Sequence, residues 1–177
     1  MKKLLFVAFL GLAPTLGVVA QTTYKFGHIN GQEVLFLMSE RDSAQAKMMA
    51  YAKDLEEQVE TMQVEYNNKL NSYQKQAKTW SDAIREQKEK ELQEIGQRIQ
   101  EFQATAQREL QEKQTEFLQP VIEKANAAIR KVGKDGGFTY IFDTSSGTVP
   151  YADPEQSTDI MPQVRKELNI TKELPKR

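Results

Sequence analysis

The feature that most constrains the fold is a stretch of ninety residues, from Ser43 to Val132, that contains one glycine and one proline. These are Gly96 and Pro120, and the rest is rich in Gln, Glu, Lys, Ala and Leu, which are good helix formers. Apolar residues recur along it at every eleventh position, as at Leu55 and Tyr66. A repeat of eleven corresponds to about 3.67 residues per turn, so it predicts long, nearly straight paired helices. Two rows of this repeat are Ala44, Leu55, Tyr66 and Ala77, then Ile84, Ile95, Ala106, Phe117 and Ala128.

One narrow apolar stripe on each half of the stretch favours an antiparallel helical hairpin, because the two stripes can then bury each other. The alternative is a single rod of about 135 Å, whereas a hairpin gives a shorter arm of about 55 Å. We place the turn at residues 79–82 because Thr79 and Asp82 resemble a helix-start capping signature, with Ser81 as a second candidate cap. The only tryptophan, Trp80, lies in this turn. We expect its indole to be exposed, without a neighbour in its own chain to pack on.

The flanks of the helical stretch have the composition of short strands. Tyr24 to Asn30 is rich in aromatic residues, and Phe138 to Asp143 and Thr148 to Tyr151 are predicted strands on either side of a Gly-containing turn. Asp159 is predicted to cap a last short helix, with Pro162 in its first turn. Pro120 should kink or restart the return helix where arm meets body.

Three short strands are too few to close a core by themselves, and their open edges invite pairing with another copy. The chain is therefore expected to be mainly α with a small β body, and to form a homo-oligomer through that body. We expect a body of residues 21–42 and 119–177 and a hairpin arm of residues 43–118. The residues predicted to form the oligomer core are Phe26, Ile29, Phe138, Ile141, Phe142 and Val149.

The first twenty residues have the pattern of a secretory signal peptide. Lys2 and Lys3 precede an apolar segment, and the small residues that end at Ala20 form a cleavage site. We expect cleavage after Ala20 and export, the alternative being an uncleaved membrane anchor. The chain contains no cysteine, so disulfides cannot stabilise it and a lipid anchor at the cleavage point is not expected.

Charge and side-chain chemistry exclude several functions. Without Lys2 and Lys3, 22 of the 24 basic residues remain against 25 acidic ones, a net charge of −3 that argues against nucleic-acid binding. His28 is the only histidine, so we expect a hydrogen-bonded structural residue rather than a metal ligand. Ser145 and Ser146 lack the elbow pattern and the histidine of a hydrolase. We expect no enzymatic activity, no cofactor and no metal.

A resemblance to the Skp/OmpH family of periplasmic chaperones extends over nearly the whole chain after residue 20. It rests on the order and spacing of several segments: Ile29-Asn30, the Gln/Glu/Lys-rich helical stretch, Leu118 to Ile122, Ala127 to Val132, Gly137 to Asp143, and Asp159-Ile160. The resemblance implies a jellyfish-like homotrimer, in which a small β-barrel-like body of three chains carries three helical arms around a cavity. It also implies an ATP-independent holdase that keeps unfolded outer-membrane proteins soluble.

The arm of this chain differs in charge from the best-known members of that family, which are strongly basic. From Arg41 to Lys131 it has 15 basic and 16 acidic residues. Client holding is therefore expected to be hydrophobic and weakly salt-dependent, rather than an electrostatic capture of acidic clients or lipopolysaccharide.

The residues predicted to contact a client are large, adaptable side chains of the arm. Met and Tyr accommodate varied partners well, and Trp and Tyr are enriched where binding energy concentrates. The alternative for the stripe residues is that they only hold the hairpin together. For the tryptophan we expect contact with a client, another arm tip or a membrane surface. The set is Met48, Tyr51, Met62, Tyr66, Tyr73, Trp80 and Phe102. The alternative function is a structural coiled-coil protein of the envelope that binds one defined partner or the cell wall.

Overall fold

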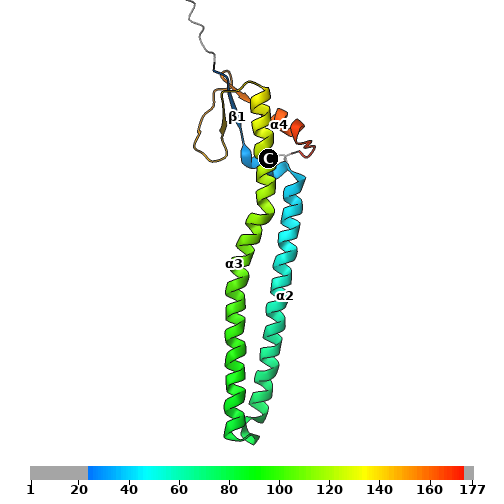
Figure 1. Cartoon of the computed structure of the whole chain (residues 1–177), viewed down its shortest axis with the longest axis vertical. Helices are drawn as coiled ribbons and strands as arrows, with labels where there is room; N and C mark the ends of the chain where they lie inside the picture. The colour runs from blue at the N-terminus through cyan, green and yellow to red at the C-terminus, as the bar shows by residue number, and fades with distance from the viewer. Residues whose placement is uncertain (1–23, 174–177) are drawn as a thin grey trace, which may run out of the picture.

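The computed structural model describes residues 24–173, which form a small body at one end of a long helical arm (Figure 1). The predicted signal peptide and its cleavage site lie outside the described residues. Within residues 24–173, no helix combines the length and the apolar character that crossing a membrane requires. We call the hairpin that projects from the body the arm, and the sheet with its covering helices the body.

The arm consists of two antiparallel helices, α2 (Ser39–Gln76) and α3 (Asp82–Asp135), that lie side by side along their length (Figure 1). The expectation of a hairpin rather than a rod is therefore confirmed. At 1.5 Å per residue, α2 is about 57 Å long. The predicted division at residues 42/43 and 118/119 stays a prediction, since both helices continue past it into the body.

The turn at the arm tip is built by a short 3₁₀ helix, η1 (Ala77–Thr79), and an extended pair of residues. The N-cap of α3 is Ser81, whose side chain accepts a hydrogen bond from the Ile84 N–H. Thr79 does not cap α3, because its hydroxyl donates back to the Gln76 carbonyl at 2.7 Å. The second candidate cap was thus correct and the first was wrong.

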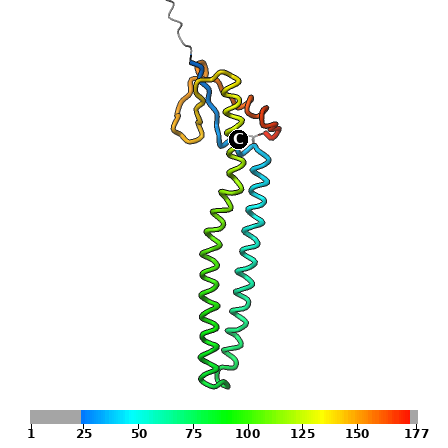
Figure 2. The backbone as a smooth tube through the Cα atoms, in the orientation of Figure 1, coloured from blue at the N-terminus to red at the C-terminus, as the bar shows by residue number. Residues whose placement is uncertain are grey.

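Helix α3 continues through Pro120 without ending, so the predicted restart does not occur. Proline lacks an N–H and clashes with the carbonyl four residues earlier, which favours a bend at such a position. Figure 2 shows α3 bending between the body and the arm. The prediction of a kink is consistent with this path.

The sheet of the body has three parallel strands in the order β2-β1-β3, with β1 (Phe26–Ile29) between β2 (Tyr140–Asp143) and β3 (Ser157–Asp159). The predicted strand Thr148–Tyr151 is wrong, because that segment belongs to the loop between β2 and β3. A strand directly after a tight turn would run antiparallel to β2, whereas a parallel partner of β1 must first be carried back along the sheet. Pro150, which has no N–H for a ladder, also disfavours a strand there.

One face of the sheet is covered by α1 (Gly31–Leu37), the C-terminal part of α3 and α4 (Met161–Glu167). The Asn30 side chain caps α1 by accepting from the Glu33 N–H at 3.1 Å. Asp159 accepts from the Met161 N–H at 2.9 Å just before α4, but the N-cap of α4 is Ile160, so the predicted cap was one residue too early. The buried core of the body joins all these elements: Ile29, Val34, Met38, Ala44, Val121, Ala125, Ala128, Ile160 and Val164.

Candidate functional site

The predicted client-contact residues of the stripe lie in the seam between α2 and α3. The fully buried side chains of this seam are small or β-branched, at Ala44, Ile95, Ile99 and Ala106. The predicted residues Met48, Tyr51, Met62, Tyr66, Tyr73 and Phe102 are all half-buried. They therefore contribute to the hairpin itself and expose only part of their surface to a partner.

Two tyrosines of α2 form hydrogen bonds to α3 through their hydroxyl groups. The Tyr51 hydroxyl donates to Glu109 Oε2 at 2.7 Å, and the Tyr73 hydroxyl donates to Glu89. These hydrogen bonds to carboxylates raise the pKa of both tyrosines. Each ring thus packs in the seam while its polar end ties α2 to α3.

Trp80 does have a neighbour in its own chain, so the expectation of an isolated indole was wrong. Its ring is half-buried and meets the ring of Tyr73 edge to face, with centroids 6.0 Å apart and planes at 61°. The η1 turn brings the indole back over the end of α2, next to the side chains of Lys69, Lys88 and Leu92. These residues line a shallow hollow of about 250 Å³ near the arm tip.

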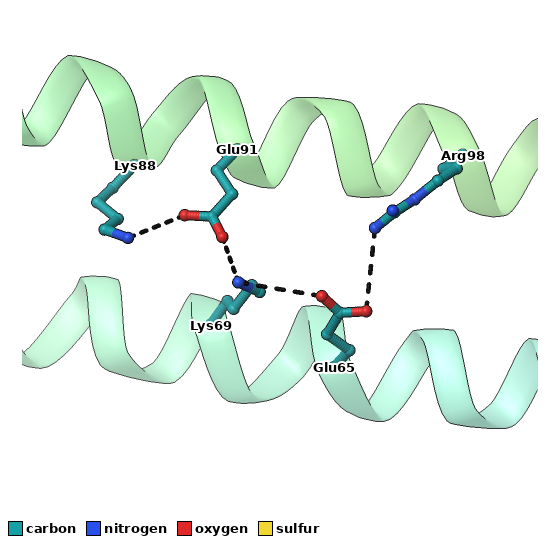
Figure 3. A network of polar contacts seen from close by, with 5 residues as sticks. All are labelled: Glu65, Lys69, Lys88, Glu91 and Arg98. Carbon is teal, nitrogen blue, oxygen red and sulfur yellow. Dashed lines mark hydrogen bonds and ion pairs between the residues drawn. The ribbon is translucent and has the colours of Figure 1, made fainter.

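A network of charged side chains ties the two helices together (Figure 3), and Lys69, Lys88 and Glu91 of this network also line the hollow. Lys69 of α2 forms ion pairs with Glu65 and with Glu91 of α3, and Glu91 also accepts from Lys88 at 2.9 Å. Arg98 of α3 lies 3.9 Å from Glu65. The ammonium groups of Lys69 and Lys88 hold the pKa of Glu91 down at about 2. These partly exposed ion pairs flank the apolar seam, where Ile95 is buried, and add polar links between the two helices.

Three large apolar side chains of the arm are exposed: Met49 is 67%, Val64 52% and Ile84 45% accessible to solvent. Met49 and Val64 lie outside the eleven-residue rows, and that offset was the available sequence signal for their exposure. Ile84 belongs to a row, but it lies in the first turn of α3, next to the arm tip. Sequence reasoning did not identify these residues as contact candidates.

The body presents an aromatic ladder on the sheet face that the helices leave uncovered. Phe26 lies beside Tyr140 in the β1–β2 register, and both rings stack near Phe142 with centroids 6.2–6.3 Å apart. Tyr140 is 60% and Phe142 40% exposed. On the same face, His28 Nδ1 lies 2.9 Å from Ser157 Oγ, so the histidine is hydrogen bonded as expected.

The predicted oligomer core is divided between two environments. Ile29 is fully buried in the core of its own chain, and Phe138 and Ile141 pack against that core. Phe26 and Phe142 belong to the exposed ladder. Val149 lies half-buried in the loop between β2 and β3. Among residues 24–173, no group of three His, Asp or Glu side chains is placed to hold a metal ion.

Comparisons with known proteins agree on one family. A family model described as outer membrane protein (OmpH-like) matches residues 25–168. The chaperone protein Skp of Vibrio cholerae serotype O1 is 28% identical over 169 residues, which cover 89% of this chain and 94% of that protein. A crystal structure from Caulobacter crescentus CB15, described as OmpH-like, superposes with a TM-score of 0.71 at 16% identity, covering 98% of this chain and 95% of the other. At that identity the superposition shows the fold.

Proposed function

Because the chain belongs to the family of OmpH-like outer membrane proteins, we propose that it is an ATP-independent holdase of the periplasm that binds unfolded outer-membrane proteins. The family match spans both the body and the arm, and a relative of nearly equal length is a chaperone. The proposal includes no catalytic step and no cofactor. Clients are held between the arms of a homotrimer, which prevents their aggregation.

The observation that carries this proposal is the set of apolar side chains that the arm leaves uncovered. Met49, Val64 and Ile84 add little to the stability of the hairpin, because they remain in water in the folded chain. Single exposed apolar residues are common in soluble proteins. Their distribution from the base to the tip of one projecting arm suits weak, repeated contacts with an extended client.

The uncovered face and the open edges of the sheet support the trimer. The aromatic ladder of Phe26, Tyr140 and Phe142 is an apolar surface that a monomer would leave in water. In addition, β2 and β3 each have one edge without a strand partner among residues 24–173. Three copies joined through these features would bury the ladders and pair the edges.

The proposal is tested by diluting several unrelated outer-membrane β-barrel proteins from urea into buffer with and without this protein, and following light scattering. We expect suppression of aggregation for all of them, at a ratio of one trimer per client. Because the arm has almost no net charge, suppression should persist up to about 0.5 M salt. Binding of a single client, or loss of activity over that salt range, would contradict the proposal.

Trp80 supplies a probe of client contact at the arm tip. Its half-buried indole should emit at an intermediate wavelength in the free protein, then shift to the blue when a client without tryptophan is added. Trp80→Ala should weaken holding while the trimer persists. Tyr24→Ala, which removes an exposed aromatic residue from the body, is the matched control and should leave holding unchanged. If the emission spectrum of Trp80 does not change when the client is added, the arm tip does not contact the client.

A further inference from the structure

The chain does not end with α4 but crosses from it to the root of the arm. Helix α4 closes with Asn169 in the left-handed conformation, at φ 55°. The Asn169 N–H donates to the Lys166 carbonyl and the Ile170 N–H to the Arg165 carbonyl, which is the hydrogen-bond pattern of a Schellman motif. Ile170 then packs on the core of the body. We call residues 169–173 the C-terminal strap.

Lys172 of the strap makes three contacts with the start of the arm. Its ammonium donates to Asp42 Oδ2 at 3.0 Å and to the Phe36 carbonyl at 3.5 Å, and it lies 5.1 Å from the centre of the Phe36 ring. The Lys172 carbonyl in turn accepts from Arg165 at 2.8 Å. The strap is thus attached at one end to α4 and at the other to both α1 and α2.

The strap spans an elbow between two helices. Helices α1 and α2 are separated by Met38 alone, which is buried and extended, at φ −74° and ψ 129°. Phe36 lies just before this elbow and Asp42 just after it. In contrast, α3 passes from body to arm without interruption. The direction of α2 relative to the body therefore depends on its packing against α3 and on how the elbow is held.

Met38 and Ala44 anchor the elbow in the buried core of the body, and a gap in the packing lies on its arm side. A hollow of about 250 Å³, lined by Arg41, Ala44, Met48 and Phe117 among others, lies between α2 and α3 directly below it. Two ion pairs on the surface hold the first turn of α2. Lys172 of the strap pairs with Asp42, and Lys124 of α3 pairs with Glu40. The carbonyl of Phe36 is among the last of α1, where helical partners run out and a cation is favourable.

We propose that the C-terminal strap is a salt-sensitive latch that adds to the hold on the α1–α2 elbow and thereby restricts the direction in which α2 leaves the body. The Lys172–Asp42 pair is exposed to solvent, so dissolved ions weaken it. When the pair is broken, α2 gains freedom to move toward or away from the hollow beside Phe117. The latch is a property of the single chain and does not depend on the proposed holdase activity.

The test uses the absence of cysteine from the chain, which allows two spin labels to be placed without background. The two labelled positions are Met49→Cys on α2, beyond the elbow, and Arg130→Cys in the C-terminal part of α3, within the body. Both positions are exposed. The labelled chain is mixed with an excess of unlabelled chain, so that distances within one chain dominate. We expect a narrow distance distribution in low salt and a broader one at about 1 M salt, where the Debye length is about 3 Å.

Lys172→Ala should broaden the distribution in low salt and make it insensitive to added salt. It should also speed amide exchange in the second turn of α2, residues 43–46, by about twofold to fivefold. The matched control is Lys166→Ala, which removes the same charge from α4 at an exposed position that is not among the contacts of the elbow. A charge exchange, Lys172→Asp with Asp42→Lys, should restore the narrow distribution.

Circular dichroism checks that each variant keeps its helix content. If Lys172→Ala proves unstable, Asp42→Asn breaks the same pair from the other side and replaces it in the test. Equal behaviour of Lys172→Ala and Lys166→Ala, or a distribution that stays narrow in every variant and salt, would overturn the proposal. Because no client takes part, this result is independent of the aggregation assay.

Discussion

At the scale of single residues, the arm depends on side chains that have both an apolar body and a polar end. Tyr51 and Tyr73 pack in the seam and donate to glutamates of α3, while Lys69 joins two carboxylates from different helices. Trp80 leans on Tyr73 at the tip. These contacts explain how a helical pair with few large apolar residues keeps one register, since each polar link fixes a position along the helices.

The charged network makes arm stability depend on pH. The folded-state pKa of Glu91 is about 2, because Lys69 and Lys88 donate to its carboxylate. A glutamate in the unfolded chain has a pKa of about 4.3. The stabilisation is therefore complete above that value and is lost as pH falls toward 2. Glu91→Gln should lower the melting temperature at neutral pH, and its difference from the wild type should vanish near pH 2.

Thermal unfolding followed by circular dichroism at a series of pH values checks this. Glu86→Gln is the control, because it removes the same charge from an exposed position of α3. It should leave the melting temperature almost unchanged at every pH. If the melting temperatures of Glu91→Gln and the wild type differ by the same amount at every pH, the effect of Glu91 does not depend on ionisation of its carboxylate.

At the scale of elements, the hairpin is a thin structure in which one helix supports the other. In α2 only Ala44 is fully buried, and the buried residues of the arm part of α3 are Ile95, Ile99 and Ala106. Gly96 lies beside the ring of Tyr66, at a distance where an added Cβ would make ordinary contact. Near the tip the two helices pack only against each other. The arm should therefore open from its tip before the body unfolds.

The contrast between two isoleucines of α3 tests this. Ile95→Ala removes a buried side chain from the seam and should destabilise the arm by about 2 kcal/mol or more. Ile84→Ala makes the same change at an exposed position and should stay within about 0.5 kcal/mol. Amide exchange should show lost protection along the arm in Ile95→Ala and unchanged protection in β1. Equal effects of the two substitutions would mean that the seam contributes little to the arm.

At the scale of the whole molecule, the two faces of the body's sheet lie in different environments. Ile141 points toward α3, where its Cδ1 would lie 2.8 Å from a Cβ on Gly133. Its neighbour Phe142 belongs to the exposed ladder on the other face. The inner face is closed by helices of the same chain, and the outer face is the one available to other copies.

Adjacent residues therefore give a sharp test of the trimer. Phe142→Asp places a charge on the outer face and should dissociate the oligomer into folded protomers. Ile141→Asp places it in the core of one chain and should unfold the body, because a buried unpaired carboxylate is costly. Sedimentation and circular dichroism measure the two outcomes. A wild-type monomer at micromolar concentration, or a Phe142→Asp protein that sediments like the wild type, would refute assembly through the ladder.

What the sequence alone determined lies in its local patterns. The eleven-residue rows, the scarcity of Gly and Pro between Ser43 and Val132, and the capping residues near Trp80 predicted two long helices and their turn. These signals are reliable because helix formation depends on contacts three and four residues apart, all of which are visible in the sequence.

What only the tertiary structure decided depends on contacts between distant residues. The third strand is Ser157–Asp159, which has no recognisable strand pattern and exists because β1 offers it an edge. The alternation in Phe138 to Asp143 indicated two faces of a strand, but not that Ile141 faces α3 and Phe142 faces outward. Likewise, the indole of Trp80 is half-buried because the η1 turn directs it onto Tyr73. Such placements follow from the packing of whole elements, where the burial of an apolar side chain is decided by what the fold brings next to it.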